Sequence, residues 1–96
     1  LLVVRTDCAD ADLGEEFLRT LRRDCASKLP PGAQLVGPLP SPMQRRAGRF
    51  RAQLLMTAPT RRDAQAGAAL LVAGAEALPA RGGLKWTIDI DPLDVF

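Results

Sequence analysis

The chain has 96 residues, a length that fits one small domain. Its composition, 47% hydrophobic and 25% charged, is that of a folded globular domain and excludes a disordered tail. The absence of histidine excludes Ser-His-Asp and Cys-His nucleophile pairs and His-ligated metals. Two cysteines are too few for a cysteine-only zinc site. A formal net charge of +2 is too small to imply nucleic-acid binding by itself.

The first residues, LLVVRTDC, are typical of the middle of a strand, and the chain does not begin with Met. We therefore expect a fragment of a longer protein with further domains upstream. No signal peptide and no multi-cysteine framework is present, which favours a reduced, cytosolic compartment. Cys8 and Cys25 are interpreted as packing residues, and a disulfide between them stays open.

The first third of the chain predicts a strand followed by a helix. Residues 1–8 are apolar and β-branched, which favours a strand. Asp10 or Asp12 can cap the helix that follows, and Pro30 and Pro31 end it. Its apolar residues recur at helical spacing, which indicates one buried face: Leu13, Phe17, Leu18, Leu21 and Cys25.

The middle of the chain predicts two more strands. Residues 33–37 form a short one, and the prolines that follow require an edge strand or an extended loop: Pro38, Pro40 and Pro42. Residues 44–48, QRRAG, are expected to be a loop with a flexible Gly48. Residues 49–56 alternate, with Phe50, Ala52, Leu54 and Met56 on one face and Arg49, Arg51, Gln53 and Leu55 on the other.

The last part of the chain predicts a helix and a final strand. Thr60 is the expected N-cap with Asp63 three residues later, and Pro79 ends the helix, whose small residues would let it lie close to a sheet. Residues 84–91 alternate, so Leu84, Trp86, Ile88 and Ile90 share one face and Lys85, Thr87, Asp89 and Asp91 the other. Trp86 is interpreted as a core residue rather than a base-stacking platform.

The element order βαββαβ predicts an α+β, ferredoxin-like fold in a single domain, residues 1–96. Two helices would cover one face of a four-stranded antiparallel sheet. The other face would be open and would carry the polar set of the last two strands: Arg49, Arg51, Gln53, Lys85, Thr87, Asp89 and Asp91.

The basic residues gather in the middle of the chain, because residues 45–62 contain six arginines and no acid. Such a segment favours phosphate contacts, although a solvated surface or docking onto a neighbouring domain are alternatives. With Lys85 from the open face, the DNA-binding candidates are Arg45, Arg46, Arg49, Arg51, Arg61, Arg62 and Lys85. No catalytic and no metal-binding residue is expected.

Other functions of this fold fit the sequence poorly. An acylphosphatase-like enzyme needs an Asn and a phosphate-cradling loop after the first strand, whereas this chain has no Asn and an acidic loop there. An RNA-recognition motif needs several aromatic residues on the open face, and only Phe50 lies in the corresponding stretch. Asp89 and Asp91 could hold a hard cation, but pairing with Arg49 or Arg51 across the sheet is favoured.

Two stretches, residues 37–56 and 84–96, resemble the carboxy-terminal domain of the primosomal protein N′ (PriA) family of replication-restart helicases. The first stretch begins with a Gly-Pro-x-Pro-x-Pro run, matched by Gly37, Pro38, Pro40 and Pro42. An Arg-x-x-Gly-Arg-aromatic-Arg-x-Gln-Leu-Leu run follows, matched by Arg45 or Arg46, Gly48, Arg49, Phe50, Arg51, Gln53, Leu54 and Leu55. The second stretch matches an aliphatic-Asp-aliphatic-Asp-Pro motif at Ile88–Pro92. Phe50 stands where Tyr is more usual.

This resemblance implies a DNA-binding accessory domain of an ATP-dependent 3′–5′ helicase that acts at stalled replication forks. It implies a parent that uses ATP, Mg and Zn and works with forked or single-stranded DNA, single-stranded-DNA-binding protein and other primosome proteins in the bacterial cytoplasm, near the nucleoid. The motor would lie upstream, since no Gly-x-x-x-x-Gly-Lys-Ser/Thr motif is present here. The fragment itself is then expected to be no enzyme, to bind no cofactor and to contact no membrane.

Overall fold

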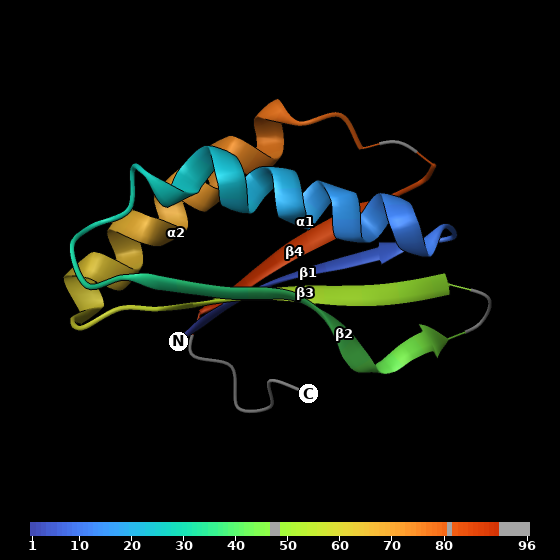
Figure 1. The fold of residues 1–96 in the computed structure, drawn as a ribbon, viewed down its shortest axis with the longest axis horizontal. Helices are drawn as coiled ribbons and strands as arrows, with labels where there is room; N and C mark the ends of the chain where they lie inside the picture. Colours follow the sequence, from blue (N-terminus) through green and yellow to red (C-terminus); the bar gives the residue numbers. More distant parts are fainter. Residues whose placement is uncertain (47–48, 81, 91–96) are drawn as a thin grey trace.

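Two helices pack on one face of a four-stranded sheet, as the element order predicted (Figure 1). The computed structural model describes residues 1–46, 49–80 and 82–90, and of Ala11 and residues 41–46 it describes the backbone. The elements in chain order are β1 (Leu2–Cys8), α1 (Ala11–Ala26), β2 (Gln34–Arg46), β3 (Arg49–Thr57), α2 (Arg61–Ala77) and β4 (Lys85–Ile90).

The sheet has the strand order β2-β3-β1-β4, and neighbouring strands are antiparallel. This is the expected α+β, ferredoxin-like arrangement. The most apolar strand, β1, takes a central place, where Leu2, Val3 and Val4 are completely buried. The edges go to β2, which is rich in proline, and to β4, which alternates between apolar and polar residues.

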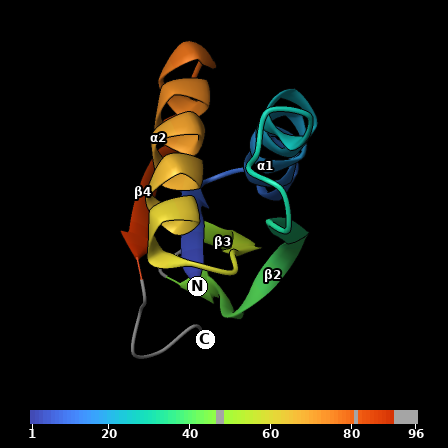
Figure 2. The ribbon, with the colours of Figure 1, turned by 90° about the vertical axis from the view of Figure 1, so that its left-hand side faces the viewer.

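The helices divide the covered face between them, with α1 over the β2–β3 half and α2 over the β4 half (Figure 2). The apolar stripe expected for α1 is buried, because Phe17, Leu18, Leu21 and Cys25 all belong to the core. Of the two possible caps, Asp10 is the N-cap, and its Oδ1 accepts a hydrogen bond of 2.9 Å from the Asp12 amide.

Helix α2 lies close to its neighbours because two residues of its inner face are glycines, which have no side chain. A Cβ atom on Gly67 would lie 2.4 Å from Met56 Sδ, and one on Gly74 would lie 2.9 Å from Cys25 Sγ. Thr60 caps the helix, since its Oγ1 accepts a hydrogen bond of 3.1 Å from the Asp63 amide. The expectations of a Thr60 cap and a closely packed helix are confirmed.

Strand β2 is longer than predicted, and the loop expected at residues 44–46 was wrong. Gln34–Arg46 pairs with β3 through two shifts of register, one between Val36 and Leu39 and one between Pro40 and Arg45. A proline cannot donate a hydrogen bond, but half of the N–H groups of an edge strand face away from the sheet, and irregular register accommodates the rest. Of the two alternatives for the prolines, an edge strand or an extended loop, the edge strand is correct. Gly48 lies outside the described residues.

Strand β4 is shorter than the expected 84–91, running from Lys85 to Ile90, and Asp91 lies outside the described residues. Leu84 is buried, and Trp86 and Ile88 pack half-buried against the core, which confirms the interpretation of Trp86. Ile90 shares the helix-side face as predicted, since it lies opposite the core residue Leu2, but it is 48% exposed. It stands at the end of an edge strand, which has a neighbour on one side only. In the described part of the chain, neither helix is long and apolar enough to cross a bilayer.

Candidate nucleic-acid interface

The sheet face without helices carries polar side chains in rows that cross the strands. Asp7 on β1 lies opposite Arg51 on β3 and Lys85 on β4, and the next row joins Gln53, Arg5 and Thr87. Residues directly opposite one another in antiparallel strands share a face. The residues that the sequence assigned to this face are therefore on it, as far as the structure describes them. The face is not open at Gln53, which is 1% exposed.

Arg49 is bound to other parts of the fold. Its Nε donates a hydrogen bond to Asp7 Oδ1, and its Nη2 donates to the carbonyl oxygens of Asp7 and Gly83 at 3.0 and 2.8 Å. The guanidinium thus ties β3 to β1 and to the connection that leads into β4. Two nitrogen atoms of this candidate, Nε and Nη2, thus donate hydrogen bonds within the fold.

Asp89 pairs with Arg5 rather than with Arg49 or Arg51, so the predicted partner was wrong. The distance from Arg5 Nη1 to Asp89 Oδ2 is 3.2 Å. The reason is the strand order and register. β1 lies between β3 and β4, and Asp89 lies in the row of Val3 and Leu55, four residues along the strands from the row of Asp7 and Arg51. The second carboxylate of the considered cation site, Asp91, lies outside the described residues.

The contribution of β1 to this face was missed from the sequence. The alternation Val3, Arg5, Asp7 in LLVVRTDC was the available signal, because its polar members fall at every second residue. The apolar residues around it masked that signal. Asp7 matters most, since it is the carboxylate that lies opposite both Arg51 and Lys85.

Arg45 and Arg46 lie at the same end of the sheet as Arg51 and Lys85. Arg45 is opposite Phe50, and Arg46 is opposite Arg49. We call Arg45, Arg46, Arg51 and Lys85 the hairpin-end cations, after the β2–β3 hairpin.

Arg61 and Arg62 lie at the opposite end of the sheet. They are the first two residues of α2, which follows the far end of β3, and both are exposed. Because β3 has nine residues and a strand rises about 3.3 Å per residue, roughly 25 Å separate these helix-end cations from the hairpin end. The acid-free segment of the sequence is therefore split between two ends of the molecule.

Four of the candidates form no ion pair with an acid among the described residues. No ion pair joins Arg51, Lys85, Arg61 or Arg62 to an acid within residues 1–46, 49–80 and 82–90. Arg61 and Arg62 also stand at the positive end of the α2 macrodipole, which slightly destabilises the helix. Local stability does not account for cations at that position.

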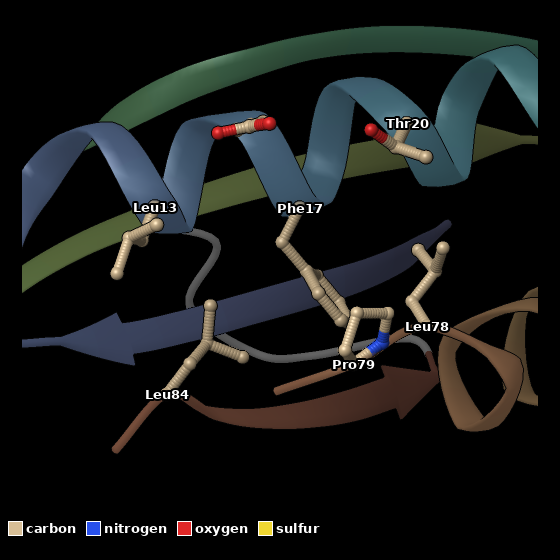
Figure 3. Close-up of a pocket in the computed structure, with 7 residues that line it drawn as sticks. Leu13, Phe17, Thr20, Leu78, Pro79 and Leu84 are labelled. Carbon is tan, nitrogen blue, oxygen red and sulfur yellow. The ribbon is translucent and has the colours of Figure 1, made fainter. Parts of the chain in front are cut away.

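A pocket of about 200 Å³ opens on the helix side, between α1, the end of α2 and the start of β4 (Figure 3). Leu13 and Phe17 of α1 point toward Leu78, Pro79 and Leu84 across it. Glu16 and Thr20 complete the lining, and none of the described residues that line it is basic. This pocket is unsuited to phosphate and lies on the face opposite to Arg51 and Lys85.

Both cysteines are buried and form no disulfide, in agreement with their interpretation as packing residues. Cys8 Sγ donates a hydrogen bond to the Gly82 carbonyl, and Cys25 Sγ donates to the Leu70 carbonyl, each at 3.6 Å. Burial raises the pKa of the Cys25 thiol above its ordinary value, and the nearby Asp24 adds to this while Lys28 opposes it.

Comparison with known proteins assigns the family. The family described as primosomal protein N C-terminal domain matches residues 1–93. The chain is also 30% identical over 93 residues to the replication restart protein PriA of Haemophilus influenzae; the match covers 97% of this chain and 12% of that protein. The chain thus spans about an eighth of the length of this relative. With a ferredoxin-like sheet, a cation-bearing open face and a family match over nearly its whole length, the chain belongs to the family of primosomal protein N C-terminal domains.

Proposed function

We propose that this chain is the DNA-binding accessory domain of a replication-restart protein and helps it to hold forked or single-stranded DNA. The observation that carries the proposal is the set of four cations without an acidic partner among the described residues: Arg51, Lys85, Arg61 and Arg62. Guanidinium and ammonium groups at such positions bind phosphate without reading sequence. Structure-directed binding of this kind suits a protein of replication restart.

In the parent protein, this domain would serve a helicase whose motor lies elsewhere. We infer an ATP-dependent 3′–5′ DNA helicase that uses ATP, Mg and Zn outside these residues, with the chain itself as its carboxy-terminal domain and without catalysis of its own. Its partners would be DNA, the upstream helicase domains, single-stranded-DNA-binding protein and other primosome proteins. The expected location is the bacterial cytoplasm, near the nucleoid.

The test is DNA binding by the purified chain across a salt series. Fluorescence anisotropy with labelled forked, single-stranded and duplex DNA would compare the wild type with the double variant Arg51→Ala/Lys85→Ala. Loss of these cations should weaken binding at every salt concentration and reduce the slope of log K against log[salt] by about 1–2.

A matched control removes the same charge elsewhere. Arg19 and Arg23 are exposed on α1, and each pairs with an acid, Glu15 at 3.8 Å and Asp24 at 3.6 Å. The variant Arg19→Ala/Arg23→Ala should leave the salt slope unchanged. If this control weakens binding as much as the open-face variant does, the effect is one of net charge and the proposed interface is wrong.

One observation favours a second function, docking onto a neighbouring domain or a protein partner without DNA contact. Val36 is 47% exposed and Leu39 is 38% exposed, and their register partners Leu55 and Gln53 place both on the open face. Exposed apolar residues beside cations are typical of a protein interface. Under this alternative, the isolated chain ignores all the DNA probes even at low salt, and Arg51→Ala/Lys85→Ala changes partner binding only.

A further inference from the structure

The two edges of the sheet are protected to different degrees. An edge strand presents a row of N–H and C=O groups that can pair with another strand. At the β2 edge, three prolines and two register shifts interrupt this row. At the β4 edge, Lys85–Ile90 contains no proline and pairs with β1 in unbroken register, and no described strand lies on its outer side.

The sequence of β4 is complementary to itself in one antiparallel register. If two copies pair about a two-fold axis through Thr87, Lys85 of each copy lies opposite Asp89 of the other. Two oppositely charged pairs then form, and Thr87 faces its own counterpart. Opposite charges and paired threonines at directly opposed positions both stabilise antiparallel strands.

The same register pairs the apolar residues. Trp86 lies opposite Ile88 of the second copy, and Leu84 lies opposite Ile90. Trp86 and Ile88 are only half-buried in the single chain, and Ile90 is 48% exposed. The pairing would therefore cover the apolar surface that the edge position leaves open.

Other registers lose these contacts. Because opposed residues share a face, the pairing can shift only in steps that keep Trp86 and Ile88 on the helix side. An axis through Ile88 places Thr87 opposite Asp89, and an axis through Trp86 places Lys85 opposite Thr87. Only the axis through Thr87 pairs Lys85 with Asp89, which favours this register.

We propose that β4 is a self-association edge, where two copies of this chain pair antiparallel about Thr87 into one continuous eight-stranded sheet. Since opposed residues share a face, all four helices lie on one side of this sheet and the two open faces form one surface on the other. The proposal does not depend on DNA binding.

Sedimentation of the 96-residue chain over a concentration series that reaches the millimolar range tests this proposal. The wild type should pass from the mass of one chain to that of two. Lys85→Glu should weaken the association by about tenfold or more, because the new glutamate of each copy then opposes Asp89 of the other, and Asp89→Lys should do the same with two lysines. An equimolar mixture of the two variants should restore the dimer, since each acid then meets a lysine.

The mixture also separates the proposal from a loss of folding, because a misfolded variant cannot regain a dimer by mixing. Val36→Lys, on the opposite edge, is the control and should leave the association constant unchanged. A wild type that stays monomeric throughout overturns the proposal. So does a dimer that both β4 variants leave intact, or one that Val36→Lys abolishes.

Discussion

At the scale of single residues, the charges of the open face divide into those that hold the fold and those that remain available. Arg49 donates to the Asp7 carboxylate and to two carbonyl oxygens, and Arg5 pairs with Asp89. Arg51 has the same charge and lies on the same strand, but has no acidic partner in the described part of the chain. Arg49 therefore stabilises the fold, whereas the charge of Arg51 remains available for a partner.

Arg49→Ala is expected to destabilise the domain by about 1–2 kcal/mol, because it removes hydrogen bonds between charged and backbone groups at a partly exposed site. Arg51→Ala should change stability by less than about 0.5 kcal/mol. Urea denaturation followed by circular dichroism measures both. Equal stability of the two variants would contradict the assignment of Arg49 to the fold.

We expect the contribution of Cys25 to the stability of the domain to fall in alkaline solution. Burial raises the pKa of its thiol, so the folded chain keeps the proton to a higher pH than the unfolded chain does. This stabilisation is complete below the unfolded pKa of about 8.5 and is lost as the pH rises through the folded pKa. The difference in Tm between the wild type and Cys25→Ala should therefore be smaller at alkaline pH than at neutral pH. A difference that is the same at both would refute the claim.

At the scale of elements, the closeness of α2 to its neighbours depends on where its small residues fall. Gly67 allows the helix to meet Met56 of β3, whose side chain is 1% exposed. Glycine costs about 1 kcal/mol relative to alanine inside a helix, so close packing must compensate for it. Position also decides which residues β2 can hold, because an edge strand accommodates prolines that a central strand could not.

Gly67→Ala is expected to destabilise the domain by about 1 kcal/mol in spite of its better helix propensity. Overpacking costs roughly 1–3 kcal/mol, which exceeds the gain of about 1 kcal/mol from alanine. Shortening the opposed side chain with Met56→Val should relieve the clash, so the double variant should be more stable than the sum of the single effects predicts. Thermal denaturation of all three variants checks this, and simple additivity would show that the two residues do not clash.

At the scale of the whole molecule, the sheet separates two groups of cations. The hairpin-end cations and the helix-end cations lie at opposite ends of β3, roughly 25 Å apart. A DNA strand that touches both must run along the sheet, whereas a strand that touches one needs only an end of the domain. Whether one or both ends of the sheet bind DNA therefore determines the path of the DNA over the domain.

We expect Arg61→Ala/Arg62→Ala to weaken the binding of forked DNA independently of Arg51→Ala/Lys85→Ala. The groups share no contacts, so the losses in binding free energy should add in the quadruple variant, and the salt slopes should fall in proportion. Titration of the four chains with one forked probe gives both quantities. If the helix-end variant binds like the wild type, contact is confined to the hairpin end.

Much of this protein follows from its sequence alone. Alternation of period two in residues 49–56 and 84–90 and the apolar stripe of α1 determine the elements, because each pattern fits only one backbone period. Asp10 or Asp12 and Thr60 mark the starts of the helices through cap chemistry, and the prolines restrict their segment to an edge strand or an extended loop. The faces of β3 and β4 follow from the same periodicity, and so do the candidates Arg51 and Lys85.

The strand order is decided by the tertiary structure, and the partners of the charges depend on it. Placing β1 between β3 and β4 gives Asp89 to Arg5 and brings Asp7 beside Arg49, contacts between residues that lie far apart in the chain. The length of β2 also depends on pairing with β3, which overrides the weak strand propensity of its prolines. The net charge of +2 therefore does not show which cations form ion pairs in the fold and which do not. Some cations are neutralised across strands and others are not, since Coulomb interactions act through space and not along the chain.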